Sequence, residues 1–123
     1  MARELAPGER PLHWVGSSLK DMARFPLDVQ RSIGFALSAA QYGGKHPSAK
    51  PWKGEGQRVF EVVKDHDGDT FRAVYTVRFV NAVYVLHAFQ KKSPRGVITR
   101  QSDINLIRER LKLAQLNYKE QYA

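Results

Sequence analysis

The stretch Tyr84-Val85-Leu86-His87-Ala88-Phe89-Gln90-Lys91-Lys92-Ser93 decides the fold, because it joins a packed strand to a cationic end. Its first six residues are mostly aromatic, β-branched or aliphatic, and such side chains favour a pleated surface with apolar neighbours. Lys91 and Lys92 then follow together, and Ser93-Pro94 ends the strand. We therefore expect a strand inside a sheet that carries positive charge to its own carboxyl end.

Two further strands precede this stretch and are joined to it by short turns. Apolar side chains alternate with other side chains over residues 58–64 and again over residues 70–79, where Phe71 and Phe79 are predicted to share one face. Asp67-Gly68 between these strands is a strong hairpin signal, and residues 80–82 predict a second turn. Residues 65–69 have the acidic composition of a calcium loop, but Thr76 stands where the bidentate Glu is required. The pattern predicts a three-stranded antiparallel meander and no metal site.

Helical periodicity occupies the regions on either side of the meander. A short strand is predicted at residues 10–15, followed by helices at 17–24 and 26–42, with Ser18 and Asp21 resembling a capping box. A last helix is expected after a cap at Ser102 or Asp103. The predicted fold class is α+β in the order β-α-α-β-β-β-α, with a helical hairpin packed on an antiparallel sheet. Residues 1–9 are predicted to be a tail, and residues 10–123 a single domain.

The overall charge indicates a polyanionic partner. The 123 residues include 20 basic and 12 acidic side chains, which give a formal net charge of +8. The chain has no Cys, no long apolar run and no apolar segment of a signal peptide near its start, so we expect a cytoplasmic protein that does not enter a membrane. Residues 44–57 are predicted to form a long basic loop, in which Trp52 either anchors the loop to the core or stacks on a base.

Several polar residues interrupt the apolar strands and are the candidates for chemistry: Glu61, Arg72, His87, Lys91 and Lys92. These groups suit the attack of an RNA 2′-hydroxyl on the adjacent phosphate, because the substrate supplies the nucleophile and neither metal nor cofactor is needed. Arg72 would hold phosphate oxygens, and a crowded Lys with a lowered pKa would act as the base. Two structural alternatives stay open: a cross-strand ion pair between Glu61 and Arg72, and a purely structural His87.

Further residues are assigned to supporting roles. Tyr75 is placed with Glu61 as a structural or secondary residue, and the predicted RNA-binding residues are Lys50, Lys53, Arg58, Arg95 and Arg100. Lys91 and Lys92 alternate in direction, so only one of them is expected to face the substrate.

The strings at residues 59–63, 71–75 and 84–93 resemble the HigB-type, phage-derived branch of the RelE/ParE toxin superfamily over residues 10–118. This resemblance implies that the protein is the toxin of a type II toxin–antitoxin pair. Most characterised toxins of this superfamily are ribosome-dependent endoribonucleases that cut mRNA. The resemblance also implies a small helix-turn-helix antitoxin as partner. By motif position, Arg72 corresponds to the phosphate-binding Arg, and Lys91 or Lys92 to the basic residue that ends the last strand. Thr99-Arg100 departs from the family's usual Thr-Pro, and neither Tyr118 nor Tyr122 matches the late Tyr of RelE-like sites.

Two other functions stay open at this point. Relatives in the ParE branch poison DNA gyrase and cut nothing. A degenerate phage-derived protein would bind nucleic acid or a partner protein without catalysis.

Overall fold

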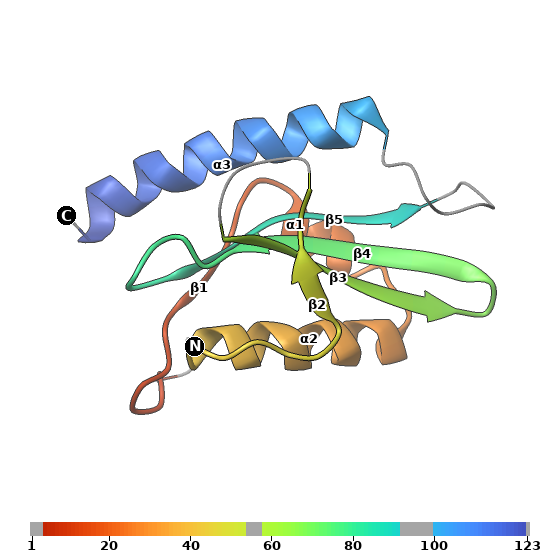
Figure 1. Ribbon diagram of the computed structural model, residues 1–123, viewed down its shortest axis with the longest axis horizontal. Helices are drawn as coiled ribbons and strands as arrows, with labels where there is room; N and C mark the ends of the chain where they lie inside the picture. Colours follow the sequence, from red (N-terminus) through yellow and green to blue (C-terminus); the bar gives the residue numbers. More distant parts are fainter. Residues whose placement is uncertain (1–3, 54–57, 92–99, 123) are drawn as a thin grey trace.

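A computed structural model of the chain describes residues 4–53, 58–91 and 100–122. Its centre is a five-stranded sheet in the order β1-β5-β4-β3-β2. The strands are β1 (Leu12–Trp14), β2 (Ala49–Pro51), β3 (Val59–His66), β4 (Asp69–Thr76) and β5 (Val83–Lys91), and the helices are α1 (Ser18–Met22), α2 (Leu27–Gln41) and α3 (Gln101–Tyr122). Helices α2 and α3 lie on opposite sides of the sheet (Figure 1). The predicted α+β class and element order are confirmed, with β2 as an additional strand.

Strands β3, β4 and β5 form the predicted antiparallel meander. The β3–β4 turn has positive φ at both central residues, +48° at Asp67 and +84° at Gly68, as expected of a tight type I′ hairpin. Strand β4 ends at Thr76, earlier than predicted, because the Thr76 hydroxyl donates to the Arg58 carbonyl and accepts from the Arg78 N–H. Phe79 therefore leaves the face predicted for it and packs on the side of α3.

The two edge strands differ from the prediction in direction and number. Strand β1 pairs in parallel with β5, so the sheet is mixed rather than wholly antiparallel. Strand β2 lies in the region predicted to be a loop and pairs antiparallel with β3, from Ala49 opposite Val62 to Pro51 opposite Phe60. Three residues ending in Pro are too short to show a strand period in the sequence.

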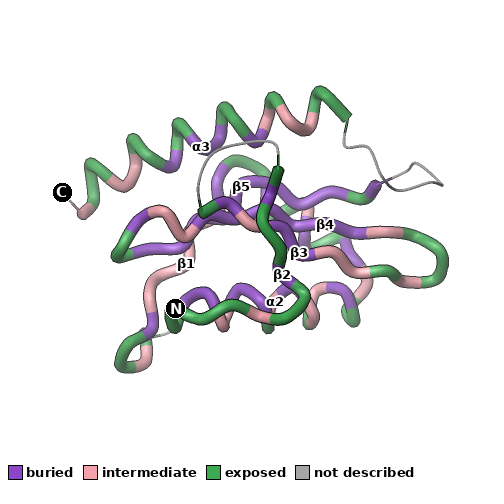
Figure 2. Tube along the Cα trace, viewed as in Figure 1, coloured by how far each residue is buried: buried purple, intermediate pink, exposed green. Residues whose placement is uncertain are grey.

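Both faces of the sheet are covered, and buried residues run along β4 and β5 (Figure 2). On the face toward α2, here called the α2 face, Val29, Ile33 and Leu37 pack with the strand residues Ala73 and Tyr75. On the opposite face, here called the α3 face, Ile107 and Leu111 pack in one cluster with strand and loop residues that include Val74, Leu86 and Trp52. Trp52 is buried in that cluster, which supports the interpretation that it anchors the loop.

The predicted helix caps are wrong, because tertiary partners take the side chains concerned. Ser18 is buried in α1, and its hydroxyl donates to the Val85 carbonyl. Asp103 lies inside the first turn of α3 and contacts His87. The chain before β1 also contacts α2, because Glu9 is buried and accepts a hydrogen bond from Gln41. In the described part of the chain, no helix combines the length and the hydropathy needed to span a membrane.

Arg110 fixes α3 to the rest of the molecule. Its guanidinium is buried and donates to the Leu86 carbonyl of β5 at 3.0 Å and to the Ser17 hydroxyl before α1 at 3.0 Å. The guanidinium lies so close to Gly16 that a Cβ there would stand 2.8 Å from its Nε. Gly16 also has φ +58°, a conformation that other residues adopt only with strain.

We expect Gly16→Ala to lower the free energy of unfolding by about 2–3 kcal/mol, the sum of left-handed backbone strain and displacement of a buried guanidinium. Gly8→Ala is the matched control, because Gly8 has φ +80° but no atom within 4 Å of the position that a Cβ would take. The control variant is expected to lose only about 1 kcal/mol. Urea unfolding of the two variants measures the difference, and equal losses would contradict the proposed contact.

Candidate functional site

Strands β2 to β5 contribute charged side chains to one region of the α3 face: Lys50, Glu61, Arg72 and Lys91. The register explains why they meet. Lys50 lies directly opposite Glu61, and Arg72 lies two residues from Val74, the partner of Glu61 in β4. Lys91 is opposite Thr70, two residues from Arg72 on the other side. Partners across a ladder and residues two apart share a face, so these residues form one group, here called the four-strand cluster.

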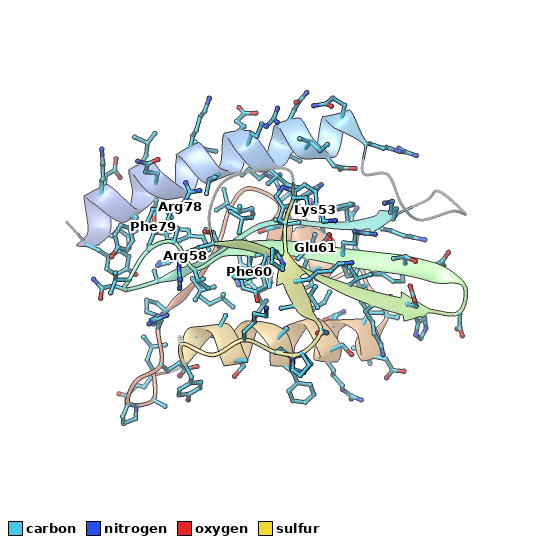
Figure 3. All side chains as sticks on the ribbon, viewed as in Figure 1. Lys53, Arg58, Phe60, Glu61, Arg78 and Phe79 are labelled. Atoms are coloured by element: carbon cyan, nitrogen blue, oxygen red, sulfur yellow. The ribbon has the colours of Figure 1, made fainter. Side chains whose placement is uncertain are left out.

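Glu61 has contacts with two other members of the four-strand cluster and lies on β3, next to the edge strand β2 (Figure 3). One of its carboxylate oxygens, Oε2, accepts a hydrogen bond from Arg72 Nη1 at 2.7 Å, and the other lies 3.8 Å from Lys50 Nζ. Glu61 and Arg72 are both buried, whereas the Lys50 side chain is 58% exposed. The predicted cross-strand pairing of Glu61 with Arg72 is therefore present, as a diagonal pair.

Lys91 is a buried amine beside this ion pair. The residue is only 8% exposed, and within the described structure its Nζ has no hydrogen-bond partner. Burial lowers the pKa of Lys91 from its ordinary value, and the charges of Arg72 and Lys50 lower it further, while Glu61 acts in the opposite direction. A lysine in this environment releases its proton more readily than one in water, which is the property required of a general base.

His87 contacts the first turn of α3. Its Nε2 lies 2.8 Å from Asp103 Oδ1, and its ring stacks on Phe89 with centroids 4.6 Å apart. Burial lowers the pKa of His87 from 6.5, and the charge of Arg110 acts in the same direction, whereas Asp103 and, more weakly, Asp21 act to raise it. The contact of His87 with Asp103 attaches α3 to β5, which favours a structural role for His87.

The other predicted site residues are not all brought together. Lys53 and Arg100 are exposed, whereas Tyr75 is buried on the α2 face, away from the four-strand cluster. Arg58 lines a separate cleft with Phe60 and Tyr75. Lys92 and Arg95 lie outside the described residues. The contact between Lys50 and Glu61 was not predicted, because it depends on β2, which was expected to be a loop. The sequence signal for this strand is that Lys50 and the buried Trp52 are two residues apart, the spacing of side chains on one face of a strand.

Acidic and histidine side chains are not gathered into a metal centre in the part of the chain that the structure describes: no group of three or more is placed to hold an ion. The acidic residues 65–69 form the predicted hairpin instead.

Comparison with known proteins identifies a family and a similar solved structure. The family described as "Phage derived protein Gp49-like" matches residues 20–112, a span that contains the whole four-strand cluster. The structure of the toxin–antitoxin complex RelBE2 from Mycobacterium tuberculosis is similar, with 13% sequence identity and a TM-score of 0.41, over 69% of this chain and 94% of that one. No curated protein sequence matches the chain.

The lowered pKa of His87 predicts a pH dependence of stability. The unfolded chain binds this proton near pH 6.5 and the folded chain only at lower pH, so stability is full above about pH 6.5 and falls below it. As the pH is lowered from about 7 to about 5, the free energy of unfolding of His87→Gln is expected to fall less than that of the unaltered protein.

Asp103→Asn is the complementary variant, because it removes the charge that raises the pKa of His87. Without that charge, the folded chain binds the His87 proton only at still lower pH, so the free energy of unfolding of this variant is expected to keep falling to a lower pH than that of the unaltered protein. Urea unfolding over this pH range provides the measurement, and unchanged pH slopes in both variants would refute the account.

Proposed function

This chain belongs to the phage-derived Gp49-like family of RelE-like toxins, and on that premise we propose that it cleaves mRNA on the ribosome without a metal ion. The observation that supports this most directly is the buried amine of Lys91 beside the buried pair of Glu61 and Arg72. Such a group has no evident structural use, because a buried amine without a hydrogen-bond partner costs stability.

The reaction uses the RNA's own 2′-hydroxyl as nucleophile. Lys91 in its neutral form accepts the 2′-hydroxyl proton, the 2′-oxygen bonds to phosphorus, and the bond from phosphorus to the 5′-oxygen breaks. The departing 5′-oxygen takes up a proton from water, and the protonated Lys91 returns its proton to the solvent, so the products are a 2′,3′-cyclic phosphate and a 5′-hydroxyl. Arg72 holds the phosphate oxygens through its planar N–H donors while Glu61 fixes the guanidinium in place. The exposed charge of Lys50 stabilises the negative phosphorane.

The charge of the cluster suits this substrate. Three cations surround a single carboxylate, so the cluster keeps an excess of positive charge when Lys91 is protonated. This excess attracts the RNA backbone, and the binding is expected to weaken with salt. When RNA enters, its phosphate adds negative charge beside Lys50 and Arg72.

The biological setting follows from the proposed activity. Residues 10–123 act as one toxin domain in the cytoplasm, where translating ribosomes present the mRNA. A small helix-turn-helix antitoxin is the cognate partner. The exposed side chains of Lys53 and Arg100 add positive charge that attracts the RNA. Roles for Lys92 and Arg95, which lie outside the described residues, rest on the sequence alone.

Replacement of Lys91 by Met tests the assignment while preserving the apolar stem of the side chain. We expect Lys91→Met to slow mRNA cleavage by at least about 100-fold and to relieve growth arrest, because the general base is lost. Lys20→Ala on α1 removes the same charge from an exposed position and is expected to retain full toxicity. Mapping mRNA 5′ ends on ribosomes after brief induction gives the readout, with circular dichroism to confirm folding.

Full toxicity of folded Lys91→Met would rule out this role. Growth arrest accompanied by DNA damage, with translation intact, would instead indicate a gyrase poison.

The effect of Lys50 on the pKa of Lys91 gives a second prediction. Single-turnover cleavage is expected to rise with pH as Lys91 loses its proton, and Lys50→Ala should move that rise to higher pH, because Lys50 lowers the pKa of Lys91. Low ionic strength preserves the effect, since the Lys50 side chain is largely exposed. A rise at the same pH in both proteins would show that Lys91 is not the titrating base.

A further inference from the structure

A second cationic site lies on the α2 face, remote from the proposed chemistry. A cleft of about 250 Å³, here called the rear cleft, is lined by Arg10, Gly43, Lys45, Arg58, Phe60 and Tyr75, among other residues. Its members come from the segment before β1, the chain after α2, the residue before β3, and strands β3 and β4. The four-strand cluster faces the other way, so the rear cleft belongs to no part of the proposed ribonuclease site.

Three cations, Arg10, Lys45 and Arg58, line this cleft, and none of the described residues that line it is acidic. In the described ranges, none of the three forms a salt bridge, and the side-chain hydrogen bond of Arg58 goes to the neutral Val77 carbonyl at 3.3 Å. A cleft with this excess of positive charge is suited to an anion.

The positions of two of these cations are constrained by the backbone. Arg58 has φ +62°, a left-handed conformation that is strained for a residue with a side chain and that recurs at binding sites. The Arg10 guanidinium passes over Gly43, where a Cβ would lie 3.6 Å from its Nη2. This distance is an ordinary contact, so it places the Arg10 guanidinium beside the end of α2 without requiring a glycine there.

Aromatic side chains form the other wall. The rings of Phe60 and Tyr75 are stacked with centroids 5.9 Å apart, and Lys45 Nζ lies 5.6 Å from the centre of the Phe60 ring. Phe60 is only half-buried, so part of it is accessible. Burial raises the pKa of Tyr75 to about 12, so its phenol stays protonated and is available as a donor.

The dipole of α2 accounts for only part of this charge. Cations at a helix C-terminus stabilise its last carbonyls, whose combined effect equals roughly half an elementary charge. Here the N–H groups of Gly43 and Gly44 already donate to the carbonyls of Ala40 and Ala39. Three cations thus exceed what the end of the helix requires.

We propose that the rear cleft binds a nucleotide, with its phosphate held by Arg10, Lys45 and Arg58 and its base against Phe60. An acidic peptide would use the cations but not the aromatic wall, whereas a nucleotide uses both. The nucleotide is either free or part of an RNA strand, and the chemistry of recognition is the same. This site operates independently of mRNA cleavage.

Binding to the full chain tests the proposal. The probes are AMP, adenosine, inorganic phosphate and a fluorescent DNA oligonucleotide, which lacks the 2′-hydroxyl and cannot be cleaved by the proposed reaction. AMP is expected to bind more tightly than phosphate or adenosine alone. Arg10→Ala combined with Lys45→Ala should weaken AMP binding at least about tenfold, because two charged contacts to the phosphate are lost.

Lys20→Ala combined with Arg24→Ala is the matched control, since it removes the same two charges from exposed positions on and just after α1. This control is expected to bind AMP like the unaltered protein. Phe60→Leu should reduce the preference for AMP over inorganic phosphate. Nuclear magnetic resonance provides an independent readout, with AMP shifting the backbone amides of Gly43 and Gly44.

The possible outcomes distinguish a site for free nucleotides, a site for a nucleic-acid strand, and the absence of a nucleotide site. Binding of AMP identifies a site for free nucleotides, and binding of the oligonucleotide alone, with the same dependence on Arg10 and Lys45, identifies a strand. Equal affinity for AMP and inorganic phosphate would overturn the role of Phe60. Equal losses in the test and control variants, or no binding of any probe, would overturn the site.

Discussion

The buried ion pair between Glu61 and Arg72 is the interaction on which the candidate site depends. Without its carboxylate, the cations of Lys50, Arg72 and Lys91 would repel one another on one face of the sheet. With it, the guanidinium is held in a fixed orientation, and burial keeps the pKa of Lys91 lowered although Glu61 acts to raise it. Burying such a pair contributes little to stability by itself, and removing one partner leaves an uncompensated charge. The proposed chemistry gives the pair a second role, which is to orient Arg72 beside Lys91.

The alternation of side chains along β3 and β4 divides the molecule into two chemically different faces. The α3 face presents the four-strand cluster, and the contacts of Arg110 and His87 hold α3 against that face. The α2 face carries Phe60 and Tyr75, which become a wall of the rear cleft at the end of α2. The same two strands thus contribute to two separate groups of cationic side chains, one on each face of the sheet.

Sequence patterns predicted the parts of the fold that depend on local chemistry. The Asp67-Gly68 hairpin, the three-stranded meander and the two long helices follow from turn residues and periodicity, as does the pairing of Glu61 with Arg72.

Features set by distant partners were missed or wrong. Strand β2 is too short to show a period, so the contact of Lys50 with Glu61 was hidden. Ser18 and Asp103 bond to β5 rather than capping helices, and Phe79 changes face because β4 ends at Thr76. The catalytic roles of His87, Lys91 and Arg72 remain predictions.

The central claim is that the RNA's own 2′-hydroxyl attacks its phosphate, with Lys91 as the base. The chemical ends left by the purified protein on ribosome-bound mRNA test this claim most directly. Attack by the 2′-hydroxyl leaves a 2′,3′-cyclic phosphate on the upstream fragment and a 5′-hydroxyl on the downstream fragment. A 3′-hydroxyl paired with a 5′-phosphate would show that water is the nucleophile and would contradict the account.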